Sequence, residues 1–475
     1  MPKLSLPLLQ GAKQTDLDYR DLLPVNMMPV IRNIKGDQGY LLTVDGLESF
    51  ADTNGVARGG YYNERFKKHF RVSGDKLESI GTDGSVEVLG VIPGNDICKF
   101  ASSFNTQAIL SEGRLFLYDN ATLRELSSPN LGFPIDIAQF RGIYVLTDGE
   151  NVYQTDITDE FSVSPLKFVT SEFSNDPTVA VRQTENNQII AFNTTSIEYF
   201  YFDPSNDVSV SVLSPIQGKS TKVGVAGANC IAEMDGAYFC IGARPGEEFE
   251  TFGLAAGGRA QQISTRHINQ ILKGRSRTEL SKVFIESRYS DSQHVLLIHL
   301  SDCTLAYSHT IAKSAGLGGA WSVLKSGKDN DIYRAKFGVF DPRISKWVYG
   351  DILENKLGTL SKDTASQYDE PAECECYTPI NYLDGNIVLQ NVTFQTIPGF
   401  SEVDTKLIYS FTDNGVTFGN ESSFIISEQQ RYKKEINIRS GGMFTELMGM
   451  KIRFVSNSKQ AISGCVIEYR ARATS

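Results

Sequence analysis

Short runs of alternating apolar and polar residues, joined in pairs by turn-forming residues, recur along the chain between residues 70 and 360. Alternation with a period of two is the pattern of a half-buried β-strand. Gly-Asp, Glu-Gly, Asp-Gly and Pro-Gly stand at the centres of most pairs, where a tight turn needs a positive or preset φ angle. Each pair therefore predicts a β-hairpin. The instances are FRVSGDKLESI (70–80), AILSEGRLFLY (108–118), YVLTDGENVYQT (144–155), IIAFNTTSIEYFYF (189–202), AYFCIGARPGEEFETFGL (237–254), LLIHLSDCTLAY (296–307) and WVYGDILENKLGTL (347–360).

The spacing of these hairpins predicts a β-propeller of six or seven blades. Their turns lie near residues 74, 113, 149, 195, 246, 302 and 355. Successive turns are roughly 36 to 56 residues apart, and a repeat near 40 residues with β-hairpins is typical of propeller blades. An irregular pair of β-sandwiches is the alternative. The longer intervals must hold insertions, and one is a predicted helix within 264–284, where Ile268, Ile271 and Leu272 recur at helical spacing after a Ser264–Thr265 cap.

The pattern changes after DTASQYDEPAECECYTP (363–379). Alternating runs then follow about every 10 to 15 residues, which fits an antiparallel β-sandwich. Within them, YSFTDNGVTFG predicts a hairpin with a tight two-residue turn, or its bulged relative, at Asp-Asn-Gly. The expected fold class is therefore mainly β, with an N-terminal arm over 1–39, a propeller over 40–370 and a C-terminal antiparallel β-sandwich over 371–475.

Charge bears on the partners of the chain. Its 475 residues include 46 Lys and Arg against 56 Asp and Glu, a formal net charge of −10. This balance opposes tight coating of nucleic acid, because phosphate binding depends on Lys and Arg, while an acidic wall would let DNA slide past. The denser basic stretches, NERFKKHFR (63–71), KGRSR (273–277) and RYKK (431–434), are scattered along the sequence. We expect no sequence-specific binding of DNA.

The chain shows no membrane or secretion signal. Its apolar runs fall short of the roughly 20 residues of a membrane span, and the start, MPKLSLPLLQGAK, is too short and too interrupted by proline for a secretory signal. We expect no stable membrane insertion and folding in a cytoplasm. The odd count of 7 Cys at irregular spacing agrees with buried free thiols in a reducing compartment.

Candidate metal ligands do not form a site in the sequence. Cys374 and Cys376 are separated by one residue, which does not match the spacing of paired zinc cysteines. His294 and His299 are five apart on a predicted strand, so they face opposite sides and cannot share a metal. We expect no metal and no cofactor.

Catalytic motifs are also missing. Gly218-Lys219-Ser220 lacks the first glycine of a phosphate-binding loop, since position 213 is Leu, and no predicted helix follows it. The stretch FTDNGVTF (411–418) approaches the Asp-box turns of some propeller hydrolases, but it occurs once and lies outside the predicted propeller. A tight hairpin is the simpler interpretation, and we expect no catalytic residues.

Several stretches, in order along almost the whole chain, resemble the tail accessory factors of short-tailed bacteriophages, also called packaged-DNA stabilisation proteins. They are DYRDLLPVNMMP (18–29), GYLLTVDGL (39–47), NGVARGGYYN (54–63), TSIEYFYF (195–202), KVGVAGANC (222–230), LLIHL (296–300), WSVLKSGKDNDIYRA (321–335), ASQYDE (365–370) and SGCVIE (463–468). None is a catalytic motif, so the specificity of the resemblance rests on their number and order. The stretches 85–190 and 400–460 differ most.

The resemblance implies a structural virion protein rather than an enzyme. Such a protein is the hub or nozzle of a short tail, a ring taken to be hexameric that extends the portal channel, helps to retain packaged DNA, and anchors the needle and the tailspikes. Its partners would be further copies of the chain, the portal and adaptor ring proteins, and the needle and tailspike proteins. DNA would pass through the channel, and the protein would be assembled in the host cytoplasm and reside in the tail.

Two functions of other classes stay open beside this one. The first is a propeller enzyme that degrades surface polysaccharide, which would need a cluster of carboxylates with Tyr or Arg at the mouth of the propeller. The second is a monomeric propeller scaffold that binds peptides.

The stretch DYRDLLPVNMMPV (18–30) is too broken by proline for a helix and too apolar for an idle tail. Given the resemblance, it suits docking on a neighbouring subunit or domain, and methionine adapts well to an irregular groove. The residues expected at that interface are Leu22, Leu23, Val25, Met27 and Met28. The alternative is that the arm packs on its own propeller, one form of which is the strand that closes the first and last blades.

Overall fold

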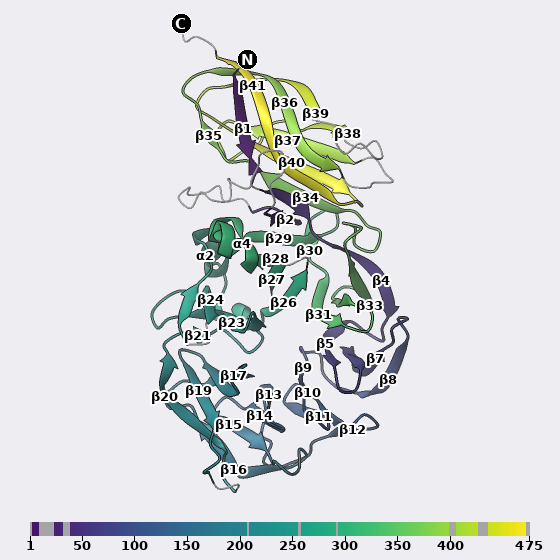
Figure 1. The fold of residues 1–475 in the computed structure, drawn as a ribbon, viewed down its shortest axis with the longest axis vertical. Helices are drawn as coiled ribbons and strands as arrows, with labels where there is room; N and C mark the ends of the chain where they lie inside the picture. Colours follow the sequence, from purple (N-terminus) through teal and green to yellow (C-terminus); the bar gives the residue numbers. More distant parts are fainter. Residues whose placement is uncertain are drawn as a thin grey trace. The chain divides into compact units, whose positions relative to one another are not determined.

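The structure is a computed structural model, which describes residues 2–8, 23–31, 39–206, 209–254, 258–290, 293–398, 405–425 and 436–471. The chain divides into two compact units, both built mainly of β-strands (Figure 1). Unit A comprises Ser49–Ser287 and Arg334–Thr359. Unit B comprises Met1–Glu48, Arg288–Tyr333 and Leu360–Ser475.

Seven sheets of four or five antiparallel strands carry the repeat. The first four are β5 (Ala57–Asn63), β6 (Lys68–Ser73), β7 (Lys76–Ile80), β8 (Val86–Val91); β9 (Lys99–Ser102), β10 (Gln107–Ser111), β11 (Arg114–Tyr118), β12 (Leu123–Glu125); β13 (Asp136–Phe140), β14 (Ile143–Thr147), β15 (Asn151–Thr155), β16 (Val163–Thr170); and β17 (Thr178–Gln183), β18 (Gln188–Asn193), β19 (Ile197–Phe202), β20 (Leu213–Thr221). The other three are β21 (Gly224–Val225), β22 (Ile231–Met234), β23 (Ala237–Ala243), β24 (Glu250–Leu254), β25 (Ala260–Gln262); β26 (Phe284–Ser290), β27 (Gln293–His299), β28 (Thr304–Ser308), β29 (Trp321–Ser326), β30 (Asp331–Ile332); and β31 (Ala335–Asp341), β32 (Lys346–Asp351), β33 (Lys356–Ser361), β4 (Gly46–Asp52).

Each of the predicted hairpins is found as an inner pair of one of these sheets. The pairs are β6–β7, β10–β11, β14–β15, β18–β19, β23–β24, β27–β28 and β32–β33. At β10–β11 the turn residues Glu112 and Gly113 have φ angles of 45° and 74°, as a two-residue type I′ turn requires. The local sequence signals were therefore sufficient to place the central hairpin of each of the seven repeat sheets.

The last sheet takes its fourth strand from the beginning of the chain. Its order is β31–β32–β33–β4, so β4 (Gly46–Asp52) precedes the first sheet in sequence and completes the final one. The described part of the arm, residues 23–30, is therefore not the strand that closes the repeat. Closure by a strand from the other end of the repeat pairs an edge that would otherwise stay open.

The predicted insertion is confirmed as a helix. Helix α2 (Arg266–Lys273) follows the N-cap Thr265, whose side chain accepts a hydrogen bond from the backbone of Ile268. Ile268 and Leu272 are its buried residues, as the helical spacing predicts. A second short helix, α3 (Arg277–Leu280), leads into β26.

Two further sheets in unit B form the antiparallel sandwich. One is β2 (Met27–Val30), β3 (Tyr40–Thr43), β41 (Gln460–Ala471), β36 (Ile387–Pro398), β39 (Ile436–Phe444), with β1 (Lys3–Pro7) on β41; the other is β34 (Ala372–Tyr377), β40 (Leu447–Ser456), β37 (Lys406–Thr412), β38 (Ser422–Ile425), with β35 (Asn381–Tyr382) on β40. Their shared core contains Phe394, Ile452 and Cys465 together with Leu6 and Met27 from the N-terminal strands. The sandwich is thus assembled from both ends of the chain.

The tight turn predicted at Asp-Asn-Gly is wrong. Strand β37 ends at Thr412 and β38 begins at Ser422, so residues 413–421 form a wider loop. The Oδ1 atom of Asn414 accepts hydrogen bonds from the backbone amides of Val416 and Thr417 at 2.8 and 2.9 Å. This side-chain turn competes with direct strand pairing.

Candidate functional site

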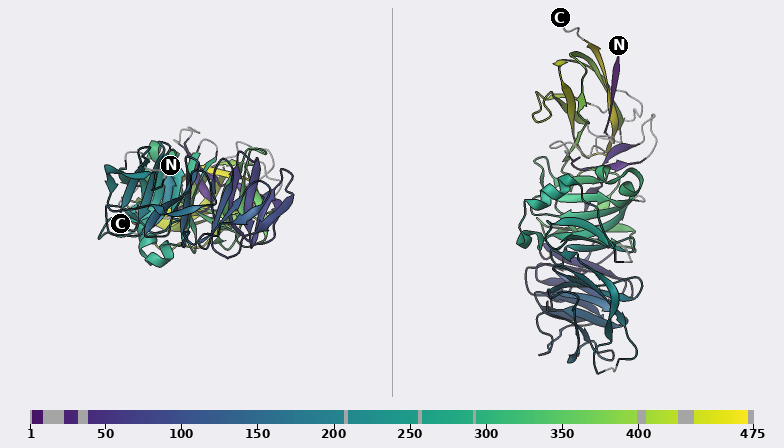
Figure 2. Two further views of the ribbon diagram at one scale, coloured as in Figure 1. Left: turned by 90° about the horizontal axis from the view of Figure 1, so that it is seen from below. Right: turned by 90° about the vertical axis from the view of Figure 1, so that its left-hand side faces the viewer.

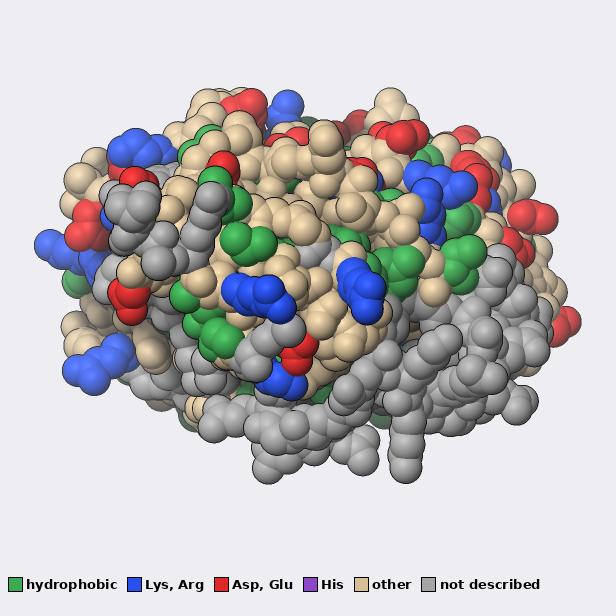
Figure 3. Space-filling view, turned by 90° about the horizontal axis from the view of Figure 1, so that it is seen from above, with side chains coloured by type: hydrophobic (Ala, Val, Ile, Leu, Met, Phe, Trp, Pro, Cys, Tyr) green, Lys and Arg blue, Asp and Glu red, His purple; other side chains and the backbone are tan. Residues whose placement is uncertain are grey.

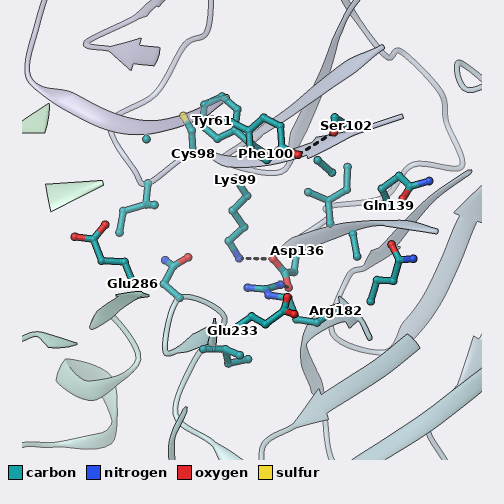
Figure 4. A pocket seen from close by; sticks show the side chains of 18 of the residues that line it. Tyr61, Cys98, Lys99, Phe100, Ser102, Asp136, Gln139, Arg182, Glu233 and Glu286 are labelled. Carbon is teal, nitrogen blue, oxygen red and sulfur yellow. Dashed lines mark hydrogen bonds and ion pairs between the residues drawn. The ribbon is translucent and has the colours of Figure 1, made fainter. Parts of the chain in front are cut away.

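A cavity of about 640 Å³ lies inside unit A (Figure 4). Every one of the seven repeat sheets contributes a strand to its wall, namely β5, β9, β13, β17, β22, β26 and β31. The lining strands of unit A are accordingly arranged around a common centre, as the inner strands of propeller blades are. This central cavity is the candidate site, because convergent polar side chains in a concave pocket are the usual place for binding.

Three charged side chains from consecutive blades meet in the cavity wall. Asp136, at the start of β13, is 1% exposed and pairs with Lys99 of β9, whose Nζ lies 3.1 Å from Oδ1. Arg182 of β17 pairs with the other carboxylate oxygen of Asp136, and Figure 4 shows Lys99 extending across the cavity towards this carboxylate. Burial lowers the pKa of Lys99, and the charge of Asp136 opposes that shift. The cluster joins three blades at their inner edges.

Further carboxylates and a tyrosine line the same cavity. Burial, reinforced by Glu185, raises the pKa of Glu233 on β22. The hydroxyl of Tyr238 donates to the backbone carbonyl of Gln183 and lies 3.5 Å from Oε2 of Glu233. Glu286 of β26 accepts a hydrogen bond of 2.6 Å from the amide of Gly338. Carboxylates, a Tyr and an Arg therefore line one cavity at the centre of the propeller, although no sequence motif indicates them.

Burial raises the pKa of two possible nucleophiles that line this cavity, Cys98 and Tyr238. All 7 cysteines are buried free thiols, and for Cys98, which lines the cavity, burial raises the pKa to about 11. Burial and the neighbouring Glu233 likewise raise the pKa of Tyr238. Among the described residues, no group of three or more His, Cys, Asp or Glu is placed to hold a metal ion. The arrangement suits binding or bracing better than nucleophilic chemistry.

The residues expected at an interface lie in different environments. Leu22 falls outside the described residues. Leu23 and Val25 are half-buried, whereas Met27 is 0% and Met28 is 7% exposed. Met27 belongs to the core of the sandwich, and both methionines pair within β2–β3. The intersubunit role of this set stays a prediction, and Leu23 and Val25 are its most accessible described members.

Asn26, which sequence reasoning missed, anchors the arm inside unit B. Its side chain donates to the carbonyl of Glu373 at 2.7 Å and accepts from the amide of Lys325 at 2.8 Å. It therefore connects β34 of the sandwich with β29 of a repeat sheet. Asn26 is fully buried and has a φ of 52°, a conformation in which asparagine is enriched. An Asn between Val25 and the apolar pair Met27–Met28 was the only local signal.

Charges of both signs share the surface. Figure 3 shows one face of the molecule, on which Lys and Arg side chains alternate with Asp and Glu and with scattered hydrophobic side chains. In the part of the chain that the structure describes, no helix has the length and apolar character needed to cross a membrane.

Two family models match the chain in the order in which its domains occur. The model described as bacteriophage P22 Gp10, beta-propeller, matches residues 4–365. The model described as bacteriophage P22 Gp10, beta-sandwich, matches residues 373–470. The chain belongs to the P22 Gp10 family. Membership confirms the resemblance to short-tailed phage tail proteins and the predicted order of a β-propeller followed by a β-sandwich.

A relative within the P22 Gp10 family matches from end to end. The tail hub protein gp10 of Salmonella phage P22 is 28% identical over 481 residues, which cover 98% of this chain and 99% of that protein. The strands β1 to β3 fall in the region matched by the propeller model, yet they pair with the sandwich sheet. The N-terminal segment of the region matched by the propeller model is therefore part of a sandwich sheet.

Two solved structures align with the chain only weakly. Virginiamycin B lyase from Staphylococcus aureus aligns with a TM-score of 0.39 at 9% identity, over 76% of this chain and 99% of that one. The extracellular domain of the one-component system BT4673 from B. thetaiotaomicron aligns with a TM-score of 0.43 at 12% identity, over 83% of this chain and 47% of that one. At scores this low, neither similarity bears on function.

Proposed function

We propose that the chain is the tail hub of a short-tailed bacteriophage, a structural virion protein and not an enzyme. The observation that carries this proposal is the end-to-end match, 98% of this chain to 99% of a phage tail hub protein, with both domains in the same order. A fold alone would not support it, because propellers host many unrelated functions.

In this role the protein forms a ring of six copies below the portal. The ring extends the portal channel, helps to retain packaged DNA, and anchors the needle and tailspike proteins. It is assembled in the host cytoplasm and remains in the virion tail. Rigid, closed sheets suit such a load-bearing part, since the inner strands are braced by buried ion pairs such as that between Lys99 and Asp136 and edges are paired.

Co-expression with the portal and adaptor ring proteins of the same phage tests this role. We expect the protein to join the portal complex in six copies, as measured by the mass of the complex and by electron microscopy. A chain that stays monomeric and never joins the complex would contradict the tail hub and favour the monomeric scaffold.

A polysaccharide-degrading propeller is the second candidate, because the central cavity gathers Asp136, Glu233 and Glu286 with Arg182 and Tyr238. Two features weaken it. The carboxylate of Asp136 is committed to Lys99 and Arg182, and Tyr238 has a raised pKa. Release of reducing ends from host surface polysaccharide, lost on Glu233→Gln, would support the enzyme. We expect no release.

A further inference from the structure

The first strand of the chain is held by the last one. Strand β1 pairs antiparallel with β41, from Lys3 opposite Glu468 to Pro7 opposite Gly464. Leu6 and Leu8 are 0% and 3% exposed and belong to the sandwich core. In Figures 1 and 2 the N-terminal strand lies along β41 at the edge of the sandwich. The groove beside β41 therefore receives an apolar strand with a defined register.

The same edge of β41 is shared by two separate segments. Strand β3 pairs with Ala461 and Ile462, and β1 takes the adjoining stretch 464–468. The β2–β3 hairpin is fixed by further bonds, including those of the buried Asn26 to β29 and β34. Strand β1 is attached differently, because it has no such partners beside it in the described part of the chain.

The described contacts of β1 are confined to the sandwich. Within the part of the chain that the structure describes, its backbone pairing, its ion pair and the bond to its Pro2 carbonyl all go to β41. Lys3 Nζ lies 3.0 Å from Oε1 of Glu468, and the amide of Tyr469 donates to Pro2 at 3.3 Å. In the described part of the chain, the backbone of the strand therefore bonds to one edge of β41 alone.

Residues 9–22 connect this strand to the rest of the chain. At 3.3–3.6 Å per residue, a segment of that length reaches at most roughly 50 Å. A tether of this reach does not restrict the strand to its own sandwich. The strand of an adjacent copy has the same sequence and therefore fits the same groove in the same register.

We propose that, in the assembled ring, residues 3–8 of each copy pair with β41 of a neighbouring copy. The proposal rests on the tail hub function, which places further copies side by side. Exchange of an identical element costs little, since every bond broken in one copy is made again in the next. In a ring each copy both gives and receives a strand, and the tether raises the effective concentration of the strand at its neighbour. The partner is therefore a second copy of this chain.

Single cysteines on the two strands test the exchange. Ser5 stands opposite Val466, and opposed residues of an antiparallel pair have Cα atoms about 4.5–5.5 Å apart, within disulfide range. Ser5→Cys and Val466→Cys are made in different chains, co-expressed with the other tail proteins, assembled and oxidised. A disulfide between positions 5 and 466 in this mixture can only join two chains. We expect covalent dimers on non-reducing gels in assembled tails and their near absence in unassembled protein.

The chain offers a matched control on the other side of the same residue. Thr393 of β36 also stands opposite Val466, but β36 is an internal strand of the sandwich sheet. A mixture of Thr393→Cys and Val466→Cys chains should give no dimers. The double variant Thr393→Cys/Val466→Cys should form its disulfide within one chain, which shows that the cysteine at 466 is reactive.

Locking the strand gives a second, reversible measurement. Ser5→Cys/Val466→Cys in one chain, oxidised before assembly, holds β1 in its own sandwich. We expect at least a tenfold loss of incorporation into tails, restored by reduction. Normal incorporation of the locked protein, or assembled tails of the mixed variants without dimers, would overturn the exchange while leaving the tail hub intact. A chain that never joins the tail would overturn both.

Discussion

The Nδ1 atom of His69 lies 3.1 Å from Oδ2 of Asp341, and both side chains are almost completely buried. His69 is on β6 of the first repeat sheet and Asp341 ends β31 of the last, so the pair joins the two ends of the repeat. The Nε atom of Arg71 donates to Nε2 of His69 at 2.9 Å, and its Nη atoms donate to the carbonyls of Phe337 and Val348 at 2.5 Å. Because Nε2 accepts a bond, the imidazole is neutral.

This pair predicts a loss of stability in mild acid. Burial, reinforced by Arg71, lowers the pKa of His69 to about 4, whereas an unfolded imidazole titrates near 6.5. Between these values the unfolded chain binds a proton that the folded chain does not, so the free energy of unfolding should fall as the pH drops from about 6.5 to about 4. The loss from this group is about 3 kcal/mol. Denaturant titrations near pH 7 and near pH 4 measure it.

The variant His69→Gln is the control for this pH dependence. It should be less stable than the parent near neutral pH, because the bonds to Asp341 and Arg71 are disturbed. Its stability should nevertheless change less between about pH 6.5 and 4, since the titrating group is gone. An unchanged slope would show that other groups cause the acid sensitivity.

Removal of the one carboxylate charge in the central ion cluster should strongly lower the free energy of unfolding. Asp136→Asn leaves Lys99 and Arg182 without their counter-ion in the wall of the cavity. Loss of one partner from a buried pair costs about 3–5 kcal/mol of unfolding free energy. The exposed pair Arg114–Glu125, with side chains 44% and 40% exposed, is the control, and Glu125→Gln should cost under about 1 kcal/mol. Equal losses in the two variants would refute a central bracing role.

In unit B, replacement of Asn26 should likewise lower the free energy of unfolding. Asn26→Ala removes the bonds to Glu373 and Lys325 and leaves a Cβ residue at a φ of 52°. We expect a loss of about 2–4 kcal/mol, since two buried polar groups lose their partners and the backbone is strained. Asn26→Gly relieves the strain alone and should lose less. If the two variants were equally stable, the strain would contribute nothing measurable.

The sequence predicted the elements whose residues lie close together in the chain, and it did not predict contacts between residues far apart in the chain. Hairpins are local, and turn residues such as Glu112 and Gly113 carry their own conformational preference, so all the repeat sheets could be placed. The pairing of β1 with β41 joins Lys3 to Glu468, and no local pattern encodes a partner so far along the chain. The wider loop at Asn414 was missed because its side chain bonds the backbone of its own turn.

The candidate site was beyond sequence reasoning for the same reason. Lys99, Asp136 and Arg182 come from three different blades, and each is an ordinary charged residue in its local context. Only the packing of neighbouring blades brings them together. The hypothesis of a polysaccharide-degrading enzyme required a cluster of carboxylates with Tyr or Arg at the mouth of the propeller. The sequence could not indicate which carboxylates would come together.

Substitutions in the arm should lower stability at its buried residues and reduce incorporation into tails at its half-buried residues. Met27 is fully buried in the sandwich core, so Met27→Ser should lower the unfolding free energy by about 2–5 kcal/mol. Leu23 and Val25 are half-buried. Leu23→Ser/Val25→Ser should keep a near-native melting curve and still reduce incorporation into tails, as measured by the copies per particle. Normal incorporation of this double variant would remove the docking role.

The last prediction concerns DNA, because a protein that acts as a conduit, as we propose for this chain, should not grip the genome. The basic stretch 63–71 is largely committed within the fold: Arg71 donates to backbone carbonyls, Lys67 pairs with Glu64, and Lys68 donates to the hydroxyl of Tyr118 at 3.1 Å.

In the stretch 273–277, Lys273 pairs with Glu248 at 2.6 Å and the guanidinium of Arg277 lies over the ring of Phe249. These charges are engaged with neighbouring side chains, and a net charge of −10 opposes the accumulation of the protein on phosphates. We expect no sequence preference in gel-shift titrations and only weak binding at about 0.15 M salt, where screening extends over about 8 Å. Binding near nanomolar that survives at that salt would show a clamp on the DNA, and retention of the genome would then no longer be steric.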